Sequence, residues 1–138
     1  MREIKFRGMG INGEWYTGNL SIIKQRIKSM GIDPGSYISN KAGVPFAFSV
    51  RPETVGQFAG LKDETDREIW EGDVVKFKSV YYENKIMKAV VKFKDSLGSF
   101  VFDRGDDQGP WRMDASIREI EVIGNIYQNP NLLLEAAE

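Results

Sequence analysis

The chain has 138 residues, of which 41% are hydrophobic and 12% aromatic, so it can bury a core as one domain or as a domain with an N-terminal arm. It contains no cysteine and no histidine, which excludes disulfides, thiolate nucleophiles, His-paired nucleophiles and nearly all zinc sites. The net charge is −1, but residues 1–52 hold eight Lys or Arg and three Asp or Glu, whereas residues 53–138 hold 11 and 17.

The first residues predict a β-hairpin. Residues 2–7 alternate apolar and basic side chains, which is typical of a strand. Asn12-Gly13 is a strong hairpin turn signal, and residues 14–17 fit the returning strand.

The next segment, Leu20 to Met30, predicts a short helix because Ile23, Ile27 and Met30 are spaced at i, i+4 and i+7. A strand over residues 20–23 is the competing interpretation, since short isoleucine-rich runs are ambiguous. The opposite side of this helix would carry Lys24, Arg26 and Lys28. This basic face could contact DNA or an acidic patch, but a solvated face is the simpler explanation because no helix-turn-helix pattern surrounds it.

The middle of the chain predicts short antiparallel strands. A turn at residues 33–35 leads to a short strand over residues 36–39, a loop over residues 40–45 and a strand over residues 46–50. A strand over residues 54–58 then precedes the acidic turn at residues 62–67. Ile69-Trp70 begins the return strand, and Glu71-Gly72-Asp73 is a second tight turn before a strand that starts at Val74. Glycine permits positive φ and aspartate can bond turn amides, so Glu71-Gly72-Asp73 is explained by geometry without catalysis.

These blocks, PETVGQFAGLKD (residues 52–63) and EIWEGDVV (residues 68–75), resemble the shared core of the YopX-like proteins, a family found mostly in phages and prophages. The opening at residues 1–7 and the closing VIGNIYQNP (residues 122–130) are similar to the start and end of that family. The resemblance implies a C-terminal SH3-like β-barrel and a phage or prophage origin. It implies no activity and brings no catalytic residues.

The second half predicts further strands over residues 74–82, 85–94, 100–103 and 117–127, with a short terminal helix over residues 132–137. In the first two of these strands, alternation directs Phe77 and Phe93 to the core and places a lysine face outside. The lysine face consists of Lys76, Lys78, Lys88, Lys92 and Lys94. It could bind phosphates, but it lacks the stacking aromatics of single-strand binders, and solvation and protection of the sheet edge explain it as well.

Two further groups of side chains are candidates for a site. Acidic residues cluster at residues 63–73 and 103–114, but neither cluster has calcium-loop spacing, so we expect no metal and no cofactor. Exposed apolar residues are candidate interface anchors, although they could instead cover the ends of the barrel. These candidates are Trp111, Leu132, Leu133 and Leu134.

Together these patterns predict a mainly β protein: an N-terminal β-hairpin and short-helix arm (residues 1–50), then a small SH3-like barrel with a C-terminal helical turn (residues 51–138). The expected function is a non-catalytic protein-binding or assembly module, with self-association as a homo-oligomer. The alternative is a nucleic-acid-binding accessory protein; an enzyme is not expected. No apolar run approaches the roughly 20 residues of a membrane-spanning helix, and the start lacks a signal-peptide core, so a cytoplasmic protein of the bacterial host is expected.

Overall fold

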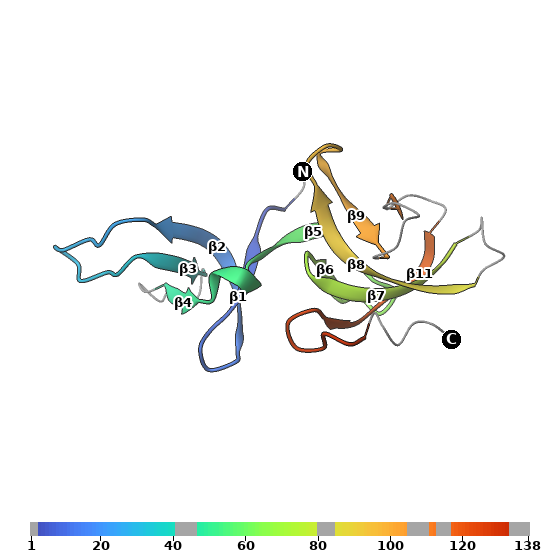
Figure 1. Cartoon of the computed structure of the whole chain (residues 1–138), viewed down its shortest axis with the longest axis horizontal. Coiled ribbons are helices and arrows are strands. Elements are labelled where there is room, and N and C mark those ends of the chain that lie inside the picture. The colour runs from blue at the N-terminus through green and yellow to red at the C-terminus, as the bar shows by residue number, and fades with distance from the viewer. Residues whose placement is uncertain (1–2, 41–46, 80–84, 105–110, 113–116, 133–138) are drawn as a thin grey trace. The chain divides into compact units, whose positions relative to one another are not determined.

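The computed structural model describes residues 3–40, 47–79, 85–104, 111–112 and 117–132 (Figure 1). These residues form mainly antiparallel β-strands, so the predicted mainly β class is confirmed. The chain divides into two compact units, unit 1 (Met1–Phe58) and unit 2 (Ala59–Glu138). The arm boundary expected after residue 50 stays a prediction.

Unit 1 contains one sheet with the strand order β4-β3-β2-β1-β5. Its elements are β1 (Phe6–Met9), β2 (Trp15–Ile23), β3 (Gly35–Ser39), β4 (Phe48–Val50), the 3-10 turn η1 (Pro52–Thr54) and the start of β5 (Gly56–Lys62). The predicted first hairpin is confirmed, because β1 pairs with β2 from Phe6↔Gly18 to Met9↔Trp15. Gly13 supplies the positive φ of 82° at its turn.

The predicted helix over Leu20 to Met30 is wrong, and the competing strand over residues 20–23 is confirmed. β2 continues to Ile23 and pairs with β3 from Asn19↔Ser39 to Ile23↔Gly35. Beyond β2 and β3, an isolated bridge joins Ile27 to Ile32 and the chain turns between them. The backbone N–H and C=O groups of residues 20–23, which would bond within a helix, therefore bond to β3 instead.

Unit 2 contains a five-stranded sheet with the order β10-β9-β8-β7-β11, and the end of β5 pairs with β6 beside it in sequence. Its further elements are β6 (Glu68–Trp70), β7 (Asp73–Ser79), β8 (Ile86–Lys94), β9 (Ser99–Asp103), β10 (Trp111–Arg112) and β11 (Ile117–Asn125). The core lies on one face of this sheet. Its buried members are Ala59, Ile69, Val75, Phe77, Ala89, Val91, Phe100, Phe102, Ile117 and Val122.

The closed SH3-like barrel implied by the resemblance is not found. The five-stranded sheet is open, with β10 and β11 at its two edges among the described residues. On the side away from β7, β11 receives separate hydrogen bonds from the β5–β6 turn, including Glu64 N to Ile120 O at 2.8 Å, and no strand ladder. The edge is thus covered without being continued as a sheet.

Other expectations need smaller corrections. Residues 52–54 form a 3-10 turn beginning at a proline, so the strand expected at residues 54–58 starts at Gly56 and runs to Lys62. Phe93, expected in the core, is 41% exposed, whereas Val90, expected outside, is buried. Of the predicted terminal helix, residues 133–137 lie outside the described residues, and residues 130–132 form a turn. Within the described residues, no helix has the length and apolarity to cross a membrane.

Candidate functional site

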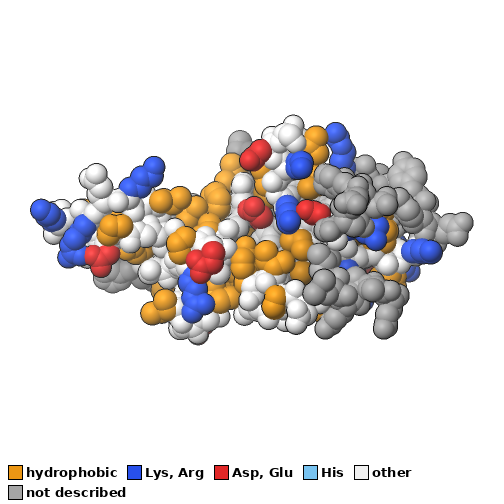
Figure 2. Space-filling model, viewed as in Figure 1, with side chains coloured by type: hydrophobic (Ala, Val, Ile, Leu, Met, Phe, Trp, Pro, Cys, Tyr) orange, Lys and Arg blue, Asp and Glu red, His pale blue; other side chains and the backbone are white. Residues whose placement is uncertain are grey.

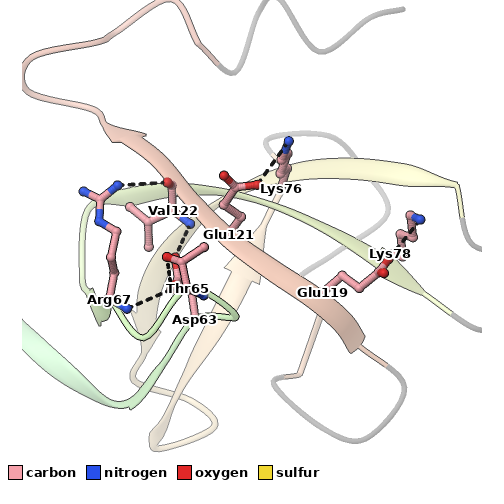
Figure 3. Close-up of polar contacts among 8 residues, drawn as sticks. All are labelled: Asp63, Thr65, Arg67, Lys76, Lys78, Glu119, Glu121 and Val122. Atoms are coloured by element: carbon pink, nitrogen blue, oxygen red, sulfur yellow. Dashed lines mark hydrogen bonds and ion pairs between the residues drawn. The ribbon is translucent and has the colours of Figure 1, made fainter.

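The predicted lysine face lies on β7 and β8, but acidic side chains accompany it. Lys76 and Lys88 are directly opposite each other in the register of β7 and β8. Lys76 Nζ lies 3.2 Å from Glu121 Oε1, and Lys78 Nζ lies 2.9 Å from Glu119 Oε2 (Figure 3). Lys92 Nζ lies 3.2 Å from Asp103 Oδ2 on β9. Three of the five lysines are therefore ion-paired, and the face is a charge-alternating surface more than a basic one.

A pocket of about 220 Å³ opens on this surface, and we call it the β7–β11 pocket. Its lining consists of Glu64, Lys76, Phe77, Lys78, Ile86, Glu119 and Glu121. Two lysines thus face three carboxylates, and the two ion pairs leave the charge of Glu64 as the excess. Phe77 is buried beneath the pocket, and Ile86 is 65% exposed. The lining therefore has one carboxylate more than it has lysines, and Ile86 is its exposed apolar side chain.

A β-bulge shapes one wall of the pocket. The register between β11 and β7 shifts between Arg118 and Glu121. Within this bulge Glu119 has a φ of 54°, a left-handed conformation that non-glycine residues seldom adopt. Bulges re-aim side chains, and here the carboxylate of Glu119 meets Lys78. The sequence predicted a strand at residues 117–127 but could not show the bulge or the lysine partners.

Beside the pocket, Asp63 joins the β5–β6 turn to β11 (Figure 3). Its Oδ1 accepts hydrogen bonds from Thr65 N at 2.9 Å, Thr65 Oγ1 at 2.8 Å and Arg67 N at 2.9 Å. Its Oδ2 accepts one from Val122 N at 2.9 Å. Arg67 Nη1 donates to Val122 O at 3.3 Å. The two side chains together satisfy the peptide groups that a neighbouring strand would otherwise bind.

The surroundings of Asp63 also set its ionisation. Burial acts to raise its pKa, but hydrogen bonds from Val122, Arg67 and Thr65 favour the carboxylate and prevail, so its pKa is lowered. The side chain is thus an ionised acceptor held inside the protein, with its oxygens used for structure.

The family-like turns also use their polar residues for backbone bonding. Asp73 is buried and its Oδ2 accepts a hydrogen bond from Trp70 N at 2.8 Å. Between them Gly72 has a φ of 94°, and a Cβ there would lie 2.8 Å from Tyr127 Cε2. After β11, the Oδ1 of Asn125 accepts from Tyr127 N at 3.0 Å and Gln128 N at 2.9 Å. Asp73 and Asn125 thus stabilise turns by accepting hydrogen bonds from backbone amides, a role that the sequence predicted for Glu71-Gly72-Asp73.

The candidate interface residues lie in two places. Trp111 is half-buried and packs on the core, with its ring centroid 5.6 Å from that of Phe77. Leu132 is also half-buried, and a Cβ at Gly124 would approach its Cδ1 to 2.5 Å. Leu133 and Leu134 lie outside the described residues. An interface role for these four residues stays a prediction.

Sequence reasoning missed an exposed ribbon in unit 1, which we call the β2–β3 ribbon (residues 19–39). Its pairing with β1 ends at Gly18, and β4 pairs with its residues 36–38, so its end beyond Ile22 and Ser36 is two-stranded. Ile22 is 62% exposed and Met30 70% exposed, while Arg26 is ion-paired with Asp33. Figure 2 shows blue Lys and Arg side chains gathered at the end of this ribbon. The repeated isoleucines were the signal, but they were assigned to a helix.

The acidic clusters do not form a metal site in the described part of the chain, where no group of three or more Asp or Glu could hold an ion. Asp106, Asp107 and Asp114 of the second cluster lie outside the described residues.

Comparison with known proteins gives the fold and the family. The crystal structure of protein EF1440 from Enterococcus faecalis matches with a TM-score of 0.54 and 21% identity, covering 96% of this chain and 99% of that one. At this identity the likeness shows the fold alone. A search of curated proteins gave no significant match. The family described as YopX protein matches residues 5–134, nearly the whole sequence. The chain therefore belongs to the YopX protein family.

Proposed function

We propose that this protein is a non-catalytic assembly module that self-associates through the β2–β3 ribbon. The observation that carries this proposal is the exposure of Ile22 and Met30 on the β2–β3 ribbon, whose end beyond Ile22 is two-stranded. Two-stranded ribbons are marginal in water by themselves, and large exposed apolar side chains mark interaction surfaces. Docking on a partner would remove these side chains from water and order the ribbon.

The roles of the buried acids support a non-catalytic function. Asp63 and Asp73 are buried carboxylates, the kind of group that often serves as a general acid or base. In this protein they accept hydrogen bonds from backbone amides of nearby turns and of β11. Their burial is thus explained by the fold.

Sedimentation velocity across a concentration series tests the proposal. We expect the wild-type mass to exceed that of one chain and to rise with concentration. The double variant Ile22→Ser/Met30→Ser should be monomeric under the same conditions. Ile11→Ser is the matched control, because Ile11 is 86% exposed but lies in the β1–β2 turn. A wild-type protein that stays monomeric throughout would refute self-association.

Nucleic-acid binding is the second candidate function, and the basic ribbon is the observation that favours it. Lys24 and Lys28 are exposed there, and two-stranded ribbons enter grooves in some DNA-binding proteins. The ion pairs of Lys76, Lys78 and Lys92 weaken the case for the β7–β8 surface. Binding to mixed oligonucleotides that is present at low salt and lost with Lys24→Glu/Lys28→Glu would support this candidate. A phage or prophage origin, and a place in the host cytoplasm, remain predictions.

A further inference from the structure

The lining of the β7–β11 pocket contains a carboxylate, Glu64, that has no lysine partner there. Lys76 and Lys78 are matched by Glu121 and Glu119, which leaves Glu64 as the extra carboxylate on its wall. Glu64 is exposed, and its side chain forms no ion pair within the described residues. A carboxylate beside apolar wall matches a side chain that has an apolar stem and a cationic end.

We propose that this pocket receives the tip of the β2–β3 ribbon from a second copy of the chain, with Lys28 directed to Glu64 and Met30 packed on Ile86. This inference rests on the self-association proposed above and names the acceptor surface for it. The pocket lies wholly within unit 2 and the ribbon wholly within unit 1.

The ribbon tip has the matching chemistry. Lys28 and Met30 lie in the turn that follows Ile27, where Gly31 N donates to Lys28 O. The neighbouring Arg26 is ion-paired with Asp33, whereas Lys28 has no ion pair within the described residues. A lysine stem can lie along the exposed Ile86 while its ammonium reaches Glu64.

Burial arguments favour the same pairing. Ile86 is 65% exposed and Met30 70% exposed, so contact between them removes two apolar side chains from water at once. Methionine adapts its shape to irregular surfaces, which suits a shallow pocket. Two copies that exchange ribbons reciprocally form a closed two-fold dimer, whereas one-way insertion forms a ring or an open chain of copies.

The pairing is tested by charge reversal in the full-length chain, followed by sedimentation velocity. Lys28→Glu and Glu64→Lys should each raise the dissociation constant of self-association by about tenfold or more, since each places like charges together. The double variant Lys28→Glu/Glu64→Lys restores opposite charges and should return the constant to within roughly threefold of the wild type. Both positions are exposed, so the variants are expected to fold, and circular dichroism verifies this.

Two controls make the result specific. Asp95→Lys makes the same charge change on an exposed residue of unit 2 outside the pocket, and Lys24→Glu does so on the ribbon away from its tip. Both should alter the constant by less than about threefold. The pairing would be overturned if the control variants raised the dissociation constant as much as the pocket variants do. It would also be overturned if the double variant had a dissociation constant as high as the single variants.

The outcomes also separate this inference from the proposed function. If Ile22→Ser/Met30→Ser abolishes self-association while Glu64→Lys leaves it unchanged, the ribbon assembles but the pocket is not its acceptor. If the wild type is monomeric, both the proposed function and the pairing fail.

Discussion

At the scale of single residues, the side chains of Asp63 and Arg67 bond the backbone N–H and C=O of Val122, which would otherwise be unpaired at the edge of β11. Val122 N donates to the Asp63 carboxylate, and Val122 O accepts from the Arg67 guanidinium. A neighbouring strand would offer a carbonyl and an amide at these places. Side chains from a turn therefore satisfy the edge of β11, and this edge is not left open for another chain to pair with.

Replacing Asp63 tests this role. Asp63→Asn keeps the size of the side chain but turns one acceptor oxygen into a donor that faces other donors. We expect a loss of about 1–3 kcal/mol in the free energy of unfolding, measured in urea, because a buried donor is left unsatisfied. Asp66→Asn, at an exposed position in the same turn, should change it by less than about 0.5 kcal/mol. Equal effects of the two variants would contradict the role.

The lowered pKa of Asp63 gives a dependence on pH with a definite sign. Its folded pKa lies below the unfolded value of about 3.9, so its stabilising effect is present above that value and is lost as pH falls toward the folded pKa. We expect the stability difference between wild type and Asp63→Asn to shrink from about pH 5 downward. Urea unfolding at a series of pH values measures it. A difference that stays constant down to the acid transition would contradict this assignment.

Gly72 is constrained in two ways that substitution can separate. Its φ of 94° disfavours any side chain, and a Cβ would also lie 2.8 Å from Tyr127 Cε2. Gly13 has a similar φ of 82°, but a Cβ added there would have no atom within 4 Å. Gly13→Ala thus measures the backbone cost, on the order of 1 kcal/mol, and Gly72→Ala should exceed it by roughly 1–3 kcal/mol in thermal or urea unfolding. Equal losses would show that Tyr127 moves aside freely.

At the scale of elements, the positions of strands could be predicted where a glycine-containing turn motif separates them. Asn12-Gly13 and Glu71-Gly72 lie between strands in the structure, and Asp73 begins β7. The segment at Leu20–Met30 had no such mark within it, and its isoleucines fit helical spacing. Whether it became a strand depended on β3, which lies beyond a turn and whose register could not be read locally.

The pocket shows the same limit. Lys76 and Lys78 were placed correctly on one strand, but Glu119 and Glu121 meet them only through the bulged register of β11. A bulge changes which residues face each other without changing the hydrophobic pattern that predicted the strand. The lysines could therefore be predicted from the sequence, and their neutralisation could not.

The β2–β3 ribbon should be less stable locally than the sheet of unit 2. Ile23 and Ile27 lie in the two-stranded end of the ribbon, whereas Val75 and Val91 are fully buried in a five-stranded sheet. Native-state hydrogen exchange should show the ribbon amides opening at a free energy at least about 2 kcal/mol lower than those of Val75 and Val91. If self-association orders the ribbon, its protection should rise with protein concentration. Ribbon amides that open only with global unfolding would contradict this expectation.

At the scale of the whole molecule, the uneven charge seen in the sequence coincides with a structural division. Unit 1 includes the whole basic segment, residues 1–52, and unit 2 carries the acidic excess. A family resemblance correctly indicated membership and a mainly β fold, but the closed barrel that it implied is absent, since β11 ends the sheet beside the β5–β6 turn.

If the basic β2–β3 ribbon binds the acidic β7–β11 pocket, added salt should weaken self-association but not abolish it. Screening is moderate at about 0.1 M salt, where the Debye length is about 10 Å, and strong near 1 M. We expect the dissociation constant of self-association to rise by roughly three- to tenfold across this range, because the contact buries Met30 and Ile86 as well as charge. Apolar burial does not weaken with salt, so some assembly should persist. Lys28→Glu/Glu64→Lys should retain the dependence, whereas Glu64→Met should flatten it. A constant that does not change with salt would remove Glu64 and Lys28 from the contact. A constant that rises by many powers of ten would show that charge, and not the burial of Met30 and Ile86, dominates assembly.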